Sequence, residues 1–268
     1  MGRYHRSFLL IRPVPGPVQY TSNRYYPNRL PSLPVLNIKQ NSERYSHYTM
    51  NKKQVLETID KSKLVAVVRV DHPDQIDPTV DALLAGGIHV IELTMTIPDV
   101  LRYVPALKSR VGSKMVLGIG SVLNGDMARE VVASGASFIV SPILRKDIVD
   151  VAREAGVAVS VGAFSPTEIQ TAWEYGTDVV KVFPAGELGP SFIKGVRAPM
   201  PHLKLLPTGG VSESNAGEWL SAGCFALGIG NALVDIKAIR EGNYQVLTQK
   251  AEGLVRAVAQ WKESVKPG

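Results

Sequence analysis

The chain has 268 residues, with 30 lysines and arginines against 24 aspartates and glutamates, and its formal net charge is +6. Residues 1–49 hold seven of the basic residues and one of the acidic residues, so residues 50–268 are neutral overall. A neutral body removes the main electrostatic reason to expect a nucleic-acid partner. The one cysteine, Cys224, excludes an intrachain disulfide framework and a site built from several cysteines.

Residues 1–49 are predicted to be a disordered basic leader. Prolines at positions 13, 15, 17, 27, 31 and 34 disfavour a helix there. The longest apolar run, 8–11, is too short for a signal-peptide core or a membrane span, so no membrane partner is expected. Three explanations stay open: an upstream extension ahead of a working start at Met50, a transit peptide, or a functional basic arm. We expect a cytoplasmic protein, or an organellar one if the leader is a transit peptide.

From residue 64 onward, two kinds of segment alternate along the chain. Short β-branched apolar runs predict buried parallel strands at 64–68, 90–93, 115–117, 138–140, 157–161, 179–182, 203–206 and 224–227. Helical spacing predicts helices at 73–85, 99–109, 126–134, 146–154, 166–175, 190–196 and 214–221, and in the tail after 235. Eight strands, each followed by a helix, predict a single-domain α/β fold over residues 50–268, the (β/α)8 TIM barrel. A doubly wound open sheet would usually show fewer strands and a dinucleotide fingerprint.

Lys181 and Glu92 lie in otherwise apolar strands of this predicted barrel, where chemistry belongs at the carboxyl ends of the strands. A lysine ammonium is costly to bury, and a neutral amine attacks a ketone to form a Schiff base. A carboxyl group on a neighbouring inward position could move the protons that this reaction requires. The plainer alternatives are a lysine that reaches out to the barrel rim, and a structural ion pair of Glu92 with Lys181 or Arg69.

Other polar residues and glycines follow the predicted strands. Arg69 could fork onto a substrate carboxylate or pair with a helix carboxylate, and Ser121 could bind substrate or merely form a turn. Glycine-rich stretches at 207–211 and 227–231 follow strands seven and eight, where barrels bind phosphate through backbone N–H groups; tight turns are the alternative. The five histidines are scattered, so nothing local predicts a metal site.

Residues 64 to about 234 resemble the 2-keto-3-deoxy-6-phosphogluconate / 4-hydroxy-2-oxoglutarate aldolases, class I enzymes with a (β/α)8 barrel. The matching stretches are 65–69, 91–94, 118–124, 135–142, 180–185 and 207–211. The resemblance implies that Lys181 forms the Schiff base and that Glu92 is the general acid and base, without a metal or other cofactor. It also implies a homotrimer and two groups of binding residues. These are Phe183 near the keto acid, and Gly209, Gly210, Gly230 and Asn231 around the phosphate.

The sequence departs from the family pattern in four places. Thr96 stands where the gluconate-type enzymes usually carry an arginine, and Ser121 stands in place of a threonine. Val161 precedes Gly162 where a proline is usual, and Asn231 replaces a common serine. The Schiff-base chemistry is unaffected, but the carboxylate of the substrate is now expected on Arg69, with Ser121 and Thr96 beside it. That pattern is closer to the galactonate-type branch of the family.

The predicted function is a reversible aldolase that cleaves a 2-keto-3-deoxy-6-phospho sugar acid, 4-hydroxy-2-oxoglutarate or both, giving pyruvate and an aldehyde. A galactonate-type aldolase of the same family is the alternative within this chemistry. A phosphate-binding barrel acting as an isomerase or synthase would give no trapped imine. A non-catalytic binding barrel would turn over no keto acid.

Overall fold

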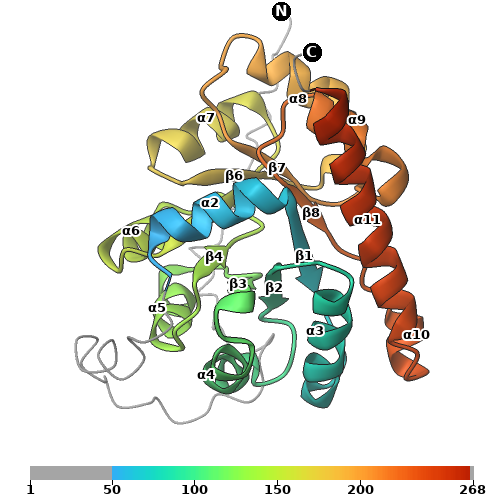
Figure 1. Cartoon of the computed structure of the whole chain (residues 1–268). Coiled ribbons are helices and arrows are strands. Elements are labelled where there is room, and N and C mark those ends of the chain that lie inside the picture. The colour runs from blue at the N-terminus through green and yellow to red at the C-terminus, as the bar shows by residue number, and fades with distance from the viewer. Residues whose placement is uncertain (1–49, 266–268) are drawn as a thin grey trace, which may run out of the picture. The chain divides into compact units, whose positions relative to one another are not determined.

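The computed structural model describes residues 50–265, and the predicted leader at 1–49 lies outside the described residues. Eight parallel strands form one sheet in the order β7-β6-β5-β4-β3-β2-β1-β8, and a parallel bridge between Thr208 and Gly228 joins its two edges (Figure 1). The strands are β1 (Leu64–Val68), β2 (Val90–Thr94), β3 (Val116–Gly120), β4 (Phe138–Val140), β5 (Ala158–Ala163), β6 (Val179–Val182), β7 (Leu205–Pro207) and β8 (Leu227–Ile229). The sheet is therefore a nearly closed barrel, and the predicted (β/α)8 fold is confirmed.

Helices alternate with the strands along the chain. They are α3 (Ile76–Ala85), α4 (Val100–Val111), α5 (Gly125–Ala133), α6 (Lys146–Glu154), α7 (Pro166–Glu174), α8 (Gly189–Arg197), α9 (Ala216–Ser221), α10 (Ile236–Arg240) and α11 (Gln245–Ser264). Two α-helices begin later than the sequence predicted, because short 3-10 helices, η3 (Pro73–Gln75) and η6 (Glu213–Asn215), form their first turns. Within residues 50–265, no helix combines the length and the apolar character needed to cross a membrane.

A further helix, α2 (Lys52–Ser62), packs on the amino end of the barrel. Asn51 begins it with a capping box, in which Asn51 Oδ1 accepts from the Gln54 N–H at 3.0 Å and Gln54 Oε1 accepts from the Asn51 N–H at 2.9 Å. Val55 and Ile59 of this helix are buried among side chains from the first residues of the strands and the turns before them. The amino end is thus filled by apolar packing, which leaves the carboxyl end for chemistry.

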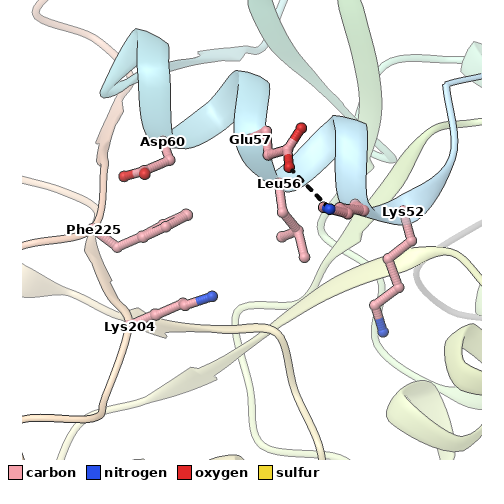
Figure 2. A pocket seen from close by; sticks show the side chains of 7 residues that line it. Lys52, Leu56, Glu57, Asp60, Lys204 and Phe225 are labelled. Carbon is pink, nitrogen blue, oxygen red and sulfur yellow. Dashed lines mark ion pairs between the residues drawn. The ribbon is translucent and has the colours of Figure 1, made fainter.

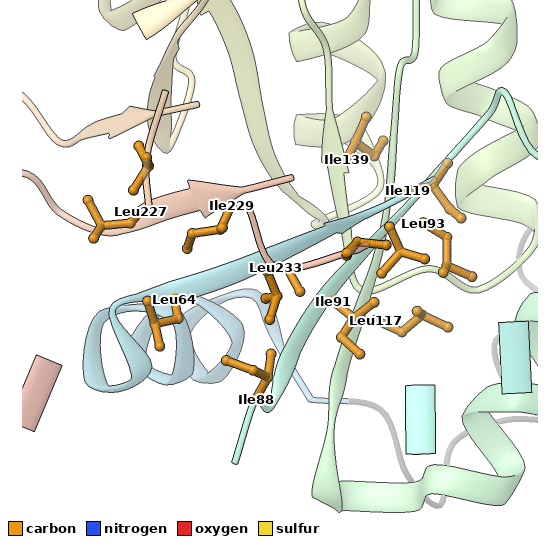
Figure 3. Packing of buried hydrophobic residues seen from close by; sticks show 14 of the residues in the cluster. Leu64, Ile88, Ile91, Leu93, Leu117, Ile119, Ile139, Leu227, Ile229 and Leu233 are labelled. Atoms are coloured by element: carbon orange, nitrogen blue, oxygen red, sulfur yellow. The ribbon is translucent and has the colours of Figure 1, made fainter. Parts of the chain in front are cut away.

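Alternation along the strands decides which side chains enter the barrel. One set of strand residues packs outward against the helices, as Leu64, Ile91, Leu117, Ile139 and Leu227 do in Figure 3. The other set faces inward and includes Val65, Val90, Phe138 and Val179, which pack with α2. Glu92 follows Val90 by two residues and Lys181 follows Val179 by two, so both point into the barrel.

Five strands have boundaries that differ from the predicted ones, and β2 differs only in ending one residue later, at Thr94. β3 and β5 extend through Gly120 and Gly162, glycines that lie beyond the predicted strand ends at 117 and 161. Glycine is required at both positions because a Cβ would overlap a neighbour, Glu92 at position 120 and the Pro142 carbonyl at position 162. β7 and β8 begin later than predicted, since Leu203 and Cys224 are buried but precede the hydrogen-bonded ladder.

Candidate active site

The structure brings Lys181 and Glu92 together inside the barrel. Lys181 Nζ lies 3.7 Å from Glu92 Oε1, and the two residues are only 5% and 1% exposed. That distance is too long for a direct hydrogen bond, and neither carboxylate oxygen has a hydrogen-bond partner among the described residues. Buried polar atoms without partners are uncommon in folded proteins and are found where a ligand or water completes the site. The pair is therefore placed for chemistry with a small polar molecule that contacts both groups.

Burial is the main cause of the shifted pKa of the Glu92 carboxyl. It raises the pKa of this carboxyl above the ordinary value, and the positive charges of Lys181 and Arg69 oppose the rise. A carboxyl with a raised pKa holds its proton at a higher pH than an ordinary carboxyl, which suits a general acid and base. The local packing supports this position, because Gly120 leaves the space that the Glu92 carboxylate fills.

Phe183 and Arg69 flank the pair. Phe183 follows β6 and places its ring centroid 5.3 Å from Lys181 Nζ, a cation–π contact. Arg69 follows β1, is exposed, and forms no ion pair with another described residue. Its charge nevertheless acts on Glu92. The guanidinium is therefore available to a carboxylate that enters from the carboxyl end of the barrel.

Thr94, Thr96 and Ser121 lie in or directly after β2 and β3. Thr94 is the next inward residue after Glu92, and its Oγ1 lies 2.7 Å from Thr96 Oγ1. The hydrogen bond ties the exposed Thr96 side chain to the inward-facing Thr94. Ser121 follows β3 with φ of 63°, in the left-handed region that non-glycine residues rarely adopt. Such backbone conformations recur at binding sites, which fits Ser121 as a candidate residue.

The two late glycine stretches meet at the same end of the barrel. Gly209 and Gly210 follow β7, Gly230 and Asn231 follow β8, and the Thr208–Gly228 bridge joins the two strands. Gly210 also approaches Gly186 so closely that a Cβ would overlap its Cα. Within the described chain, the N–H groups of Gly210 and Asn231 donate to no other residue. Free N–H groups in adjacent glycine loops suit an anion.

Thr208 is a candidate that the sequence reasoning did not single out. It lies directly after β7, is buried, and its Oγ1 has no hydrogen-bond partner in the described chain. It also points to the β8 side, since a Cβ at Gly228 would overlap Oγ1. The Pro-Thr-Gly-Gly motif, recognised for its glycines, was the signal that could have identified it.

One hollow of the described chain lies away from these candidate residues. It is a surface groove of about 520 Å³ at the amino end, lined by Lys52, Lys53, Leu56, Glu57, Asp60, Lys204 and Phe225 (Figure 2). None of the candidate residues lines it, and its lining comes from α2 and from the residues before β7 and β8. We assign the chemistry to the carboxyl end, where the buried pair lies. Within residues 50–265, no three histidine, cysteine, aspartate or glutamate side chains gather as a metal site.

Comparisons with known proteins point to one family. The family model described as KDPG and KHG aldolase matches residues 55–250. A 2-dehydro-3-deoxy-6-phosphogalactonate aldolase of Escherichia coli (strain K12) is 30% identical over 174 residues, which are 65% of this chain and 85% of the relative.

Two solved structures share the fold. A KDPG aldolase from Legionella pneumophila, with pyruvate captured as a covalent carbinolamine intermediate, has a TM-score of 0.70 and 26% identity and covers 75% of this chain and 98% of its own. A protein cage designed by fusing symmetric oligomeric domains also has a TM-score of 0.70, with 28% identity, and covers 75% of this chain and 73% of its own. The family match, the aldolase relative and the two similar structures are thus consistent with the barrel described above.

Proposed function

The chain belongs to the family of KDPG and KHG aldolases, and because it is an aldolase we propose that Lys181 attacks the ketone of its substrate with Glu92 as the proton shuttle. The observation that carries the proposal is the buried Lys181–Glu92 pair, 3.7 Å apart, with both carboxylate oxygens unpartnered among the described residues. The carbinolamine captured in the Legionella relative supports a covalent route.

The steps follow from the positions of these two groups. The Lys181 amine adds to C2 of a 2-keto acid, and Glu92 gives a proton to the hydroxyl that leaves as water. The protonated imine then withdraws the C3–C4 bonding electrons as a base takes the C4 hydroxyl proton. An aldehyde leaves, the remaining enamine takes a proton at C3, and water releases pyruvate and the free amine. The imine is the electron sink, so these steps require no metal or other cofactor.

Substrate binding is proposed for the residues around the pair. Arg69 would take the carboxylate next to the ketone, because its guanidinium has no carboxylate partner among the described residues. Thr96, Ser121 and Phe183 would line the keto-acid site. The loops of Gly209, Gly210, Gly230 and Asn231 would bind the phosphate of a 6-phospho substrate through backbone N–H groups.

The proposed substrate is a 2-keto-3-deoxy-6-phospho sugar acid of the gluconate type, 4-hydroxy-2-oxoglutarate, or both. Pyruvate release would be measured for both compounds, for the C4 epimer of the sugar acid and for its unphosphorylated form. If the glycine loops bind the phosphate, the phosphorylated substrate should have a kcat/KM at least about tenfold higher, equivalent to about 1.4 kcal/mol. No pyruvate from any of these keto acids would contradict the proposed function, and a preference for the C4 epimer would reassign the substrate to the galactonate type.

We also propose a homotrimer located in the cytoplasm. A relative used as a symmetric oligomeric domain supports assembly. An organelle is the alternative location if residues 1–49 are a transit peptide, and the observed N-terminus of the native protein would distinguish the two. Sedimentation equilibrium of the full chain tests the trimer, which predicts three times the mass of one chain.

A further inference from the structure

A small cavity inside the barrel reaches Glu92 from the α2 side. Its volume is about 20 Å³, and a cavity needs at least about 10–15 Å³ to hold one water molecule. Within the described chain its lining includes Leu56 and Ile59 of α2 but not Lys181. The cavity is therefore distinct from the space around the Lys181 amine, where the ketone would bind.

Two polar side chains reach this cavity from strands that are not neighbours. Glu92 comes from β2 and Ser160 from β5, and β3 and β4 lie between them in the sheet. Ser160 follows Ala158, which packs with α2, by two residues, so its hydroxyl also points into the barrel. Glu92 is 1% exposed and Ser160 is 7% exposed. The two groups can therefore approach each other only across the buried interior.

Both polar groups lack a hydrogen-bond partner in the part of the chain that the structure describes. This holds for the two carboxylate oxygens of Glu92 and for the Ser160 hydroxyl. The other described residues that line the cavity are all apolar. Buried polar groups are almost always satisfied by protein or by ordered water, because an unpaired one costs free energy. A buried water needs about two to four polar partners, which the serine and the carboxylate supply.

We propose that this cavity holds one ordered water molecule, and that Ser160 positions the Glu92 carboxylate through it. The Ser160 O–H donates to the water oxygen, and the water donates to a carboxylate oxygen of Glu92. The inference rests on the proposed role of Glu92 as the proton shuttle and adds the residue that holds it from the α2 side. Because the cavity is separate from the amine, Ser160 is a positioning residue and not a catalytic one.

The proposed water acts on the ionisation of Glu92. A hydrogen bond donated to an ionised carboxylate favours that form. Lys181 from β6 and Arg69 after β1 are the charged groups that act on Glu92 in the described chain, and both also favour the ionised form. The residues of α2 that line the cavity are apolar. Loss of the Ser160 hydroxyl should therefore raise the pKa of Glu92 further, because the water loses the partner that orients it.

A crystal structure of the full chain tests the water site without any substitution. At a resolution that shows ordered water, we expect density for one water molecule within about 3.2 Å of both Ser160 Oγ and a Glu92 carboxylate oxygen. A dry cavity in that map, or a direct hydrogen bond between the two side chains, would overturn the site.

The titration of Glu92 tests the positioning role without requiring turnover. The chain would be isotopically labelled at the glutamate side-chain carboxyl carbon and titrated by NMR, with Glu92→Gln to identify the signal. We expect Ser160→Ala to raise the pKa of Glu92 by about one unit, a tenfold change in its ionisation equilibrium. Val65→Ala is the matched control, because it also removes buried atoms from the cavity lining but leaves both polar groups, so it should cause no rise. An unchanged pKa in Ser160→Ala, or an equal rise in both variants, would overturn the role.

Kinetics connect the titration with the reaction. In Ser160→Ala the acid limb of kcat/KM should move to higher pH by about one unit, while KM well above the limb stays within about twofold of wild type. An acid limb that stays in place would overturn the link between Ser160 and the proton shuttle. If the wild-type chain releases no pyruvate from any keto acid while Ser160→Ala still raises the pKa of Glu92, the proposed function fails and the water site stands.

Discussion

Gly120 sets the position of the Glu92 carboxylate, and Gly120→Ala is the substitution that tests this. The added Cβ would overlap Oε1, Cδ and Cγ of Glu92. Glu92 is 1% exposed, so its carboxylate has no open solvent to move into and must shift within the barrel. The φ of Gly120 is outside the left-handed region, so alanine is tolerated by the backbone and the effect comes from the side chain.

Two consequences of Gly120→Ala follow, one in stability and one in rate. Forcing a methyl group into a packed interior costs about 1–3 kcal/mol in the free energy of unfolding. A displacement of about 1 Å at a catalytic group costs on the order of 10²-fold in rate, so kcat should fall by that factor in protein that is still folded. Thermal unfolding and steady-state pyruvate release, measured at a temperature where the variant is folded, separate the two effects.

Two other glycines supply controls for this prediction. Gly118 lies on the same strand as Gly120, and a Cβ there would overlap the Phe138 ring. Gly118→Ala should therefore lower stability by a similar amount with a much smaller loss in kcat. Gly195→Ala lies in α8 with open space around it, so it should leave kcat unchanged and raise stability by about 0.5–1 kcal/mol. A folded Gly120→Ala protein with kcat within about twofold of wild type would refute the role of Gly120 in placing Glu92.

Three more predictions follow from the same geometry. Because burial raises the pKa of Glu92, kcat/KM should fall with decreasing pH through an acid limb whose midpoint lies above the ordinary 4.5. Glu92→Gln should remove that limb and lower kcat by about 10²–10⁴-fold. An acid limb with its midpoint at or below 4.5 would contradict the assignment. Arg69→Ala should raise KM for a keto acid by about 10–100-fold with a smaller change in kcat, and Arg69→Lys should recover only part of the lost affinity. An unchanged KM would mean that another residue binds the substrate carboxylate. Burial raises the pKa of the Cys224 thiol to about 12, so alkylation at pH 8 should be on the order of 10³ slower than for a free cysteine until the protein unfolds; rapid alkylation of the folded chain would contradict that burial.

The sequence predicted the barrel because its signal is repeated. Eight apolar runs separated by helical spacing specify the order of elements even where single boundaries are wrong. The errors in β3 and β5 have one cause. Both predicted strands ended before these glycines, whereas Gly120 and Gly162 are strand residues whose missing side chains leave room for Glu92 and the Pro142 carbonyl. That reason depends on neighbours from other strands and cannot be read locally.

Part of the candidate site could be predicted from the sequence, because a barrel brings the carboxyl ends of its strands together. Lys181 and Glu92 are 89 residues apart in the chain, yet their charge in otherwise apolar strands singled both out as candidates for the barrel interior. The roles assigned to Arg69, Ser121, Thr96 and the glycine loops remain predictions, since they depend on a bound substrate. Thr208 escaped notice because the Pro-Thr-Gly-Gly motif was interpreted through its glycines alone. Its buried, unpartnered hydroxyl is visible only once the strands are assembled.

Covalent trapping tests the central claim, that Lys181 is the amine that attacks the ketone. The full chain would be incubated with pyruvate and borohydride, digested, and examined by mass spectrometry, with Lys181→Arg as the matched variant. We predict one reduced pyruvate adduct on the peptide that contains Lys181, with loss of activity in proportion to labelling, and no adduct in Lys181→Arg. An adduct on another lysine, or full aldolase activity in Lys181→Arg, would contradict the account.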